Sequence, residues 1–222
     1  LLVHGWNAEL QYLYELPLIA RALARRGVNG AILQLPFHGP RRPREPGAVR
    51  NFISDDIPVM LRATEQALAD LESFLLWAKS TGCPAAGTWD FSLGGWVAGL
   101  LLCRSDVQDI GVLTTPVSNL EEVICTLPFC EPIRRALGGA KLDLSPLNLT
   151  SHQPRIPPEK ILITQSEYDL FVSEGSLARL EEAWGHPRFW QVPHSHISVL
   201  LAWQVLRRTV FWCVEELKTR PV

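Results

Sequence analysis

Three polar side chains that follow apolar runs of the chain could together perform nucleophilic catalysis. Ser92 ends one such run, Asp169 follows the run 161–164, and His196 follows the run 189–192. A serine hydroxyl is a poor nucleophile until a base takes its proton, and that base must be oriented by a third group. A serine, a histidine and a carboxylate can supply these three functions if the fold brings them together.

Ser92 lies where a strand is expected to turn sharply into a helix, in the segment 89–96 (WDFSLGGW). Such a turn strains the serine backbone and exposes its hydroxyl at the C-terminal edge of a sheet, beside a helix N-terminus that favours negative charge. Small residues are needed there, because strand and helix nearly touch, and Gly94 and Gly95 supply them. Asp90 is unexpected, since a carboxylate two residues before the serine must either tilt into solvent or crowd the turn.

The elements that must position these residues alternate along the chain. Short apolar runs indicate buried strands, and amphipathic stretches at helical spacing lie between them. This alternation implies parallel strands, right-handed crossovers and helices on both faces of the sheet. The predicted fold class is α/β, a three-layer α/β/α sandwich with a mostly parallel sheet. The predicted strands are 1–4, 30–35, 85–91, 110–114, 160–164 and 188–192, and the predicted helices are 10–24, 54–81, 94–103, 174–184 and 197–217.

The stretch 117–159 breaks this rhythm with six prolines and the pair Gly138-Gly139. It predicts an excursion with a few short helices above the sheet, which would be either a lid over a site or a structural loop. The 222 residues are otherwise expected to form a single domain, 1–222, with this lid-like insertion.

Composition argues against several classes of function. Lys and Arg number 21 and Asp and Glu 23, so the formal net charge of −2 leaves no basic excess for nucleic-acid binding. The apolar stretches are broken well before about 18 residues, so no membrane span is expected. Five scattered cysteines without a CxxC pair argue against a zinc site and a disulfide scaffold, although Cys125 and Cys130 could pair. Free thiols are typical of a reducing compartment, and we expect a cytoplasmic location.

In this order along the chain, these features resemble the α/β-hydrolase superfamily, in its serine esterase and lipase-like branch. The segment 89–96 resembles the nucleophile elbow G-x-S-x-G, with Asp90 in place of the first glycine. The segment 4–7 (HGWN) resembles the H-G-x motif after the superfamily's third strand, and the order Ser, Asp, His also matches. The resemblance covers essentially the whole chain, and the superfamily's first two strands are apparently missing before residue 1.

The resemblance implies a catalytic triad of Ser92, Asp169 and His196. Glu167 and His194 are the competing acid and base. Asp169 is preferred because the run 168–172 (YDLFV) resembles the superfamily's acid loop, in which Asp precedes an apolar pair. His196 is preferred because the superfamily's base stands immediately before the last helix.

The resemblance also implies an oxyanion hole formed by the backbone N–H groups of Trp6 and Leu93, with Asn7 as an alternative donor. Gly5 would let the backbone approach the reacting carbonyl closely. Other side chains near these loops could line the substrate site: His4, Asn7, His38 and Trp96.

The implied activity is that of a carboxylesterase-type serine hydrolase, which cleaves an ester-like acyl bond of a small molecule through an acyl-enzyme. No metal and no organic cofactor is implied, and the oligomeric state does not follow from the sequence. Two alternatives stay open. One is a non-catalytic binding protein that kept the fold, of which Asp90 would be the sign, and the other is an acyltransferase or peptidase with the same triad.

Overall fold

The computed structural model describes residues 1–6, 11–44, 51–138 and 143–218. Six strands form one sheet in the order β2-β1-β3-β4-β5-β6, and every neighbouring pair is parallel. The predicted α/β fold class is therefore confirmed. The strands are β1 (Leu2–Val3), β2 (Ile32–Leu33), β3 (Gly87–Phe91), β4 (Ile110–Thr114), β5 (Ile161–Ser166) and β6 (Arg188–Val192).

The main helices follow the predicted amphipathic stretches, with two differences at their ends. The first stretch begins with a π-helical turn, Gln11–Glu15, before α2 (Leu16–Ala24). The last one begins with a separate 3₁₀ turn, Ser198–Leu201, because Ala202 leaves the helical conformation before α8. The other long helices are α3 (Ile57–Ser80), α4 (Leu93–Arg104) and α7 (Glu174–Ala183), and α8 covers Trp203–Lys218.

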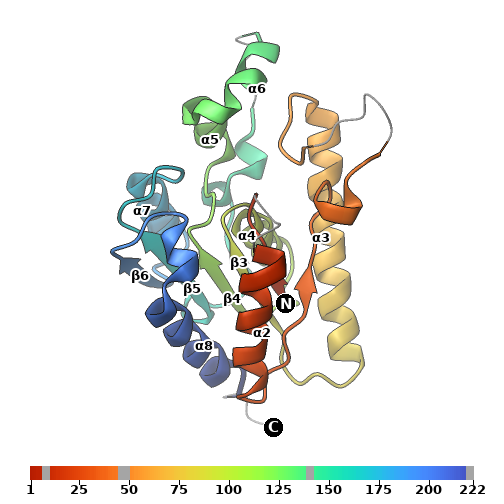
Figure 1. The fold of residues 1–222 in the computed structure, drawn as a ribbon, viewed down its shortest axis with the longest axis vertical. Helices are drawn as coiled ribbons and strands as arrows, with labels where there is room; N and C mark the ends of the chain where they lie inside the picture. The colour runs from red at the N-terminus through yellow and green to blue at the C-terminus, as the bar shows by residue number, and fades with distance from the viewer. Residues whose placement is uncertain (7–10, 45–50, 139–142, 219–222) are drawn as a thin grey trace.

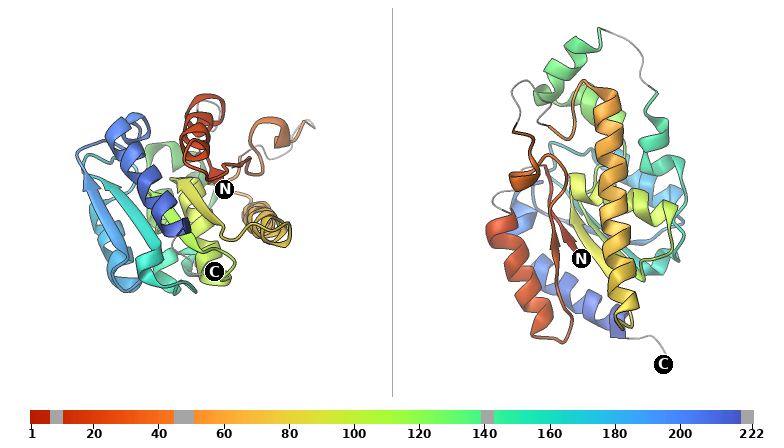
Figure 2. Two further views of the ribbon diagram at one scale, coloured as in Figure 1. Left: turned by 90° about the horizontal axis from the view of Figure 1, so that it is seen from below. Right: turned by 90° about the vertical axis from the view of Figure 1, so that its right-hand side faces the viewer.

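Alternating strand residues build two apolar cores, one on each face of the sheet. Leu162 points to the face covered by α2 and α8, and its neighbour Ile163 points to the face covered by α3, α4 and α7. Figure 2 shows the sheet between these helical layers. Because both faces are covered, side chains in the middle of a strand are shielded from water whichever way they point.

The stretch 117–159 contains short helical segments and few regular hydrogen bonds. Figure 1 shows α5 and α6 at one end of the molecule. The chain then returns to the main core, where Leu149 is fully buried and its carbonyl accepts a hydrogen bond from Trp184 Nε1 at 3.1 Å. The segments are α5 (Leu120–Thr126), η3 (Pro128–Cys130), α6 (Glu131–Ala136), η4 (Ser145–Leu147), η5 (Leu149–Ser151) and η6 (Pro158–Lys160).

Three further findings concern the described ranges. All five cysteines lie in them, and all five are free thiols, so Cys125 and Cys130 do not pair. Among these residues no cluster of three or more His, Cys, Asp or Glu side chains could hold a metal ion. No helix in the same ranges combines the length and hydrophobicity needed to cross a membrane.

Candidate active site

Ser92 occupies a strained turn between β3 and α4. Its φ of 50° and ψ of −110° lie in a region that residues with a Cβ rarely adopt. Its N–H donates to Thr114 O at 3.0 Å, which ties the turn to the neighbouring strand. At Gly94 a Cβ would lie 2.5 Å from His4 O and 2.9 Å from Val3 O, so only glycine lets α4 start this close to β1. Ser92 therefore lies in a sharp, strained connection from strand to helix.

His196 lies between Ser92 and Asp169, within hydrogen-bond distance of both. Its Nε2 is 2.9 Å from Ser92 Oγ, and its Nδ1 is 2.8 Å from Asp169 Oδ2. Asp169 Oδ1 accepts the N–H groups of Phe171 at 2.8 Å and Val172 at 2.9 Å, which fix the carboxylate. An N–H on Nδ1 facing the carboxylate leaves Nε2 free to accept the serine proton. The arrangement can therefore activate Ser92 as a nucleophile.

The competing acid and base lie on the same two loops but face elsewhere. The side chain of Glu167 is exposed, and its backbone N–H donates to Val192 O at 2.9 Å. His194 is half-buried, and its carbonyl accepts the Tyr168 N–H at 3.0 Å. These backbone bonds hold the loops after β5 and β6 side by side. The structure thus brings Asp169 and His196 together and leaves Glu167 in solvent.

The loop after β1 passes directly beside the nucleophile turn. A Cβ placed on Gly5 would lie 3.2 Å from Ser92 Cβ and 3.5 Å from Phe91 O. Trp6 follows Gly5, and Leu93 is the first residue of α4, where N–H groups have no acceptor within the helix. The two backbone segments expected to bind an oxyanion therefore flank Ser92. Asn7, the alternative donor, lies outside the described residues.

His4 holds this loop in place and does not reach a substrate site. Its side chain is fully buried, its Nε2 accepts the Leu35 N–H at 3.1 Å, and its Nδ1 donates to Gly5 O at 2.7 Å. Burial lowers the pKa of His4 to about 4, so its ring is neutral at physiological pH. This corrects the expectation that His4 lines the substrate site.

His38 and Trp96 are also buried supports for the surrounding loops. The ring nitrogens of His38 lie 2.8 Å from Pro36 O and 3.1 Å from Trp6 O, and burial lowers its pKa. Trp96 is fully buried and donates its indole N–H to Leu147 O at 2.7 Å. Their expected role as substrate-lining side chains is corrected in the same way, because backbone carbonyls occupy their polar groups.

Asp90 lies in the apolar core and not in solvent. It is paired in the sheet with Val3 and Leu113, and none of its surface is exposed. Neither carboxyl oxygen is within hydrogen-bond geometry of a partner among the described residues. Burial raises the pKa of Asp90 well above its usual value, and the Thr88 side chain offsets this only in part. The protonated, neutral carboxyl is therefore favoured. Of the two alternatives for Asp90, the tilt into solvent is wrong.

Two buried polar residues, Gln11 and Glu15, support the loop after β1 and were missed in the sequence. Gly5 donates its N–H to Gln11 Oε1 at 2.6 Å, and both Gln11 and Glu15 are almost fully buried. Burial raises the pKa of Glu15 to about 8. Their spacing of four residues places them on one helical face, but polar residues on a helix are usually exposed, so the sequence carried no signal of their burial.

Replacing Gln11 with alanine is expected to lower kcat about tenfold with little change in KM. The Gly5 N–H would lose its acceptor. The ordered conformation of the loop, which must bind an oxyanion, would then be less stable by about 1–1.5 kcal/mol. Steady-state hydrolysis of an activated ester measures both constants, and thermal unfolding checks the fold. Gln66→Ala, at an exposed position of α3, is the control. An unchanged kcat would show that Gln11 does not order the loop.

Two phenylalanines complete a row of aromatic rings beside the triad. The Phe171 ring centroid is 4.8 Å from that of His196, the Phe129 ring is 6.0 Å from Phe171, and the Trp6 ring is 5.1 Å from Phe129. We refer to Trp6, Phe129 and Phe171 as the aromatic arc. Phe129 belongs to η3, inside the stretch 117–159, and the sequence alone gave no reason to place it at the site.

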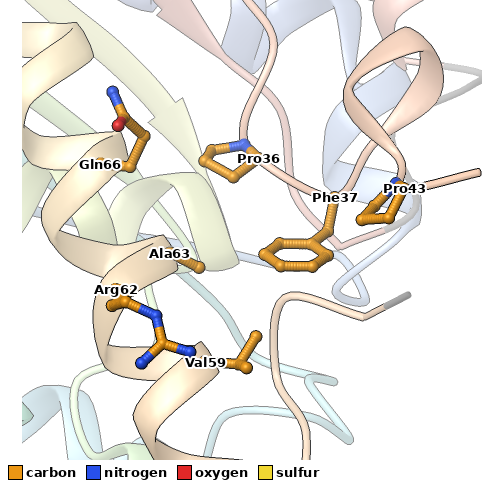
Figure 3. A pocket seen from close by; sticks show the side chains of 7 residues that line it. All are labelled: Pro36, Phe37, Pro43, Val59, Arg62, Ala63 and Gln66. Atoms are coloured by element: carbon orange, nitrogen blue, oxygen red, sulfur yellow. The ribbon is translucent and has the colours of Figure 1, made fainter. Parts of the chain in front are cut away.

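A groove of about 390 Å³ lies elsewhere, between the loop after β2 and α3. Figure 3 shows the Phe37 ring facing Val59 and Ala63 of α3. Among the described residues that line this groove there is no nucleophile and no acid or base that could accept a proton at neutral pH. The groove therefore offers no catalytic chemistry of its own.

The parallel sheet and the strained serine turn define the class of protein, which is an α/β hydrolase. The family model Alpha/beta hydrolase domain containing 18 matches residues 7–131, more than half of the chain, and the chain belongs to this family. The superfamily suggested by the sequence motifs is thereby confirmed.

Two curated relatives, the uncharacterized proteins MT2702 and Rv2627c of Mycobacterium tuberculosis strains, are each 31% identical to this chain over 179 residues. The match covers 77% of this chain and 42% of each relative, so the chain spans about two fifths of the length of these relatives.

Solved structures with the same fold include several esterases. TT1662 from Thermus thermophilus has a TM-score of 0.65 and 18% identity, and the match covers 99% of this chain and 89% of that one. A cold-adapted esterase from an Arctic intertidal metagenomic library has a TM-score of 0.61 and 18% identity, covering 98% and 82%. The esterase Pf2001 of Pyrococcus furiosus has a TM-score of 0.62 and 16% identity, covering 98% and 80%. At these identities the similarity is one of fold.

Proposed function

We propose that the protein is a serine hydrolase of carboxylesterase type, which cleaves an ester-like acyl bond of a small molecule with Ser92, His196 and Asp169 as its triad. The observation that carries this proposal is the hydrogen-bonded row of three side chains, with distances of 2.9 and 2.8 Å between groups 104 and 27 residues apart in the chain. The esterases among the proteins of similar fold support the reaction class.

In the proposed reaction, His196 Nε2 takes the hydroxyl proton of Ser92 as Oγ forms a bond to the ester carbonyl carbon. The oxyanion would be held by the N–H groups of Trp6 and Leu93. His196 then gives the proton to the leaving alcohol as its bond to carbon breaks. Water, deprotonated by His196, attacks the acyl-enzyme and releases the carboxylic acid and free Ser92. Asp169 keeps the imidazole oriented and stabilises its charged form in both steps.

The stretch 117–159 is proposed to act as a lid-like insertion of a single domain. Phe129 in this stretch contacts Trp6 on the loop after β1 and Phe171 on the acid loop. The insertion therefore reaches the surroundings of the triad, which supports a role in shaping the entrance to the site.

A fluorophosphonate probe tests the proposal, because it reacts with an activated serine and reports the modified residue by mass spectrometry. We expect the wild type to be labelled at Ser92 and the Ser92→Ala variant not to be labelled. Ser80→Ala, at an exposed serine at the end of α3, is the matched control and should be labelled like the wild type. A folded wild type that is inert to the probe and to short-chain esters would instead favour the non-catalytic binding protein.

A further inference from the structure

The aromatic arc links the loop beside Ser92 to the ring of His196 through a series of ring contacts. At one end, Trp6 directly follows Gly5, which lies so close to Ser92 that a Cβ placed on it would stand 3.2 Å from Ser92 Cβ. At the other end, the Phe171 ring lies against the ring of His196, with 4.8 Å between centroids. Phe129 bridges the two ends. A substrate group bound at Ser92 would therefore lie beside these rings.

The rings of the arc are only partly covered by the protein. Phe129 is 48% exposed and Phe171 is 37% exposed, although large aromatic side chains gain most of their stability from burial. Other exposed apolar side chains lie on the loops that carry Asp169 and His196. They are Tyr168, Leu170, Ile197 and Leu201. A concentration of exposed apolar surface around a catalytic group is typical of a binding site.

Two charged side chains of the stretch 117–159 that the structure describes are engaged with other groups. Arg134 donates to the carbonyls of Ile124 and Leu127, each at 2.7 Å. Glu122 pairs with Arg179 at 2.9 Å. A charged substrate group placed on the apolar rings would lose its water, and neither Arg134 nor Glu122 is free to pair with it, which is unfavourable.

The orientation that the proposed reaction requires of the ester determines which part of the ester contacts the arc. His196 must protonate the leaving alcohol, so the alcohol lies toward His196. The oxyanion points toward the N–H groups of Trp6 and Leu93 in the proposed site. The acyl group then extends from the carbonyl carbon along the Trp6 and Phe129 end of the arc.

We propose that the Trp6 and Phe129 end of the aromatic arc is the acyl-binding subsite, and that it selects esters of uncharged, apolar carboxylic acids larger than acetate. This inference rests on the serine hydrolase function proposed above. Phe129 acts as a specificity-determining residue, supplied by the stretch 117–159.

A series of p-nitrophenyl esters that share one alcohol tests the subsite. For the wild type, kcat/KM should rise about fourfold per methylene from acetate through butyrate to hexanoate, because each methylene buries apolar surface. The p-nitrophenyl monoester of succinate, which has a carboxylate at the end of a four-carbon chain, should react at least about tenfold more slowly than the butyrate.

Variants at Phe129 test whether this residue causes the preference for longer acyl chains. Phe129→Ala should lower kcat/KM for hexanoate about tenfold and leave acetate within about twofold, whereas Phe129→Leu should retain most of the chain-length preference. Phe211→Ala is the matched control, since Phe211 on α8 is 47% exposed and lies outside the arc. Thermal unfolding of each variant checks the fold.

The outcomes separate this inference from the function on which it rests. Labelling at Ser92 and ester hydrolysis without a rise along the series, or an equal loss on all esters in Phe129→Ala, would overturn the subsite and leave the hydrolase function standing. A wild type with neither labelling nor hydrolysis would overturn both. The predicted rise, its loss in Phe129→Ala and its retention in Phe129→Leu and Phe211→Ala would support the subsite.

Discussion

Replacing His196 with alanine is expected to lower kcat/KM for an activated ester by about 10⁴-fold or more, because Ser92 would lose the group that accepts its proton. His194→Ala, two residues earlier on the same loop, should change the rate less than about threefold, a factor that corresponds to about 0.7 kcal/mol. Steady-state kinetics at pH 8 compares the two variants. A large loss in His194→Ala with an active His196→Ala would show that the wrong histidine has been chosen as the base.

Asp169→Asn is the companion variant, and its expected loss is also about 10⁴-fold. The N–H groups of Phe171 and Val172 hold Oδ1 of Asp169, so an amide at this position would keep its oxygen there and turn its NH₂ toward His196. Nδ1 would then have to accept, which places the ring proton on Nε2 and leaves no acceptor for the serine proton. Glu167→Gln removes a charge from the same loop at an exposed position and should leave the rate nearly unchanged.

Much of this site could be predicted because the positions of its groups follow from local rules. Parallel strands place their C-terminal ends at one edge of a sheet, so polar residues just after the apolar runs ending near Phe91, Ser166 and Val192 converge there. Gly94 marks the close approach of α4 to β1, which the Gly-rich pattern after Ser92 already required. The order of strands and helices along the chain therefore follows from hydrophobic patterning.

The rest of the site depends on the path of the loops in space, which hydrophobic periodicity does not predict. Gln11 meets Gly5 only because the chain turns back after β1, and Phe129 meets Trp6 only because the stretch 117–159 folds back toward the sheet edge. His4 and His38 have the residue type of catalytic groups, but their environment commits them to backbone carbonyls and amides. Residue type alone could not separate these supporting histidines from the proposed base.

The position of Asp90 follows from the sheet once both faces are known to be covered. Asp90 lies inside β3, a central strand of a sheet covered on both faces, so its carboxylate has no route to solvent. The remaining choice is between a buried charge and a buried neutral acid. Burial outweighs the nearby Thr88 side chain and favours the neutral form. Such an acid leaves no negative charge near the turn that would oppose an oxyanion at Ser92.

Asp90→Asn is expected to change how the stability of the protein depends on pH. The unfolded carboxyl ionises near pH 4, whereas burial raises the pKa of the folded one well above this value. Between these two pKa values the folded state binds one proton more than the unfolded state. The free energy of unfolding of the wild type therefore falls by about 1.4 kcal/mol per pH unit through this group, and asparagine removes this slope. From pH 5 up to the pKa of the folded carboxyl, the variant should therefore gain about 1.4 kcal/mol per pH unit over the wild type.

Urea unfolding of both proteins at pH 5, 6 and 7 measures this difference directly. Glu15, whose pKa burial raises to about 8, adds a slope of the same sign, but it is present in both proteins and cancels. Asp106→Asn removes one carboxylate at an exposed position. Its free energy of unfolding should depend on pH in the same way as that of the wild type. If the free energy of unfolding of Asp90→Asn also has the pH dependence of the wild type, Asp90 must ionise as easily in the folded protein as in the unfolded chain. The turn at Ser92 would then carry a negative charge, and the case for a non-catalytic protein would be strengthened.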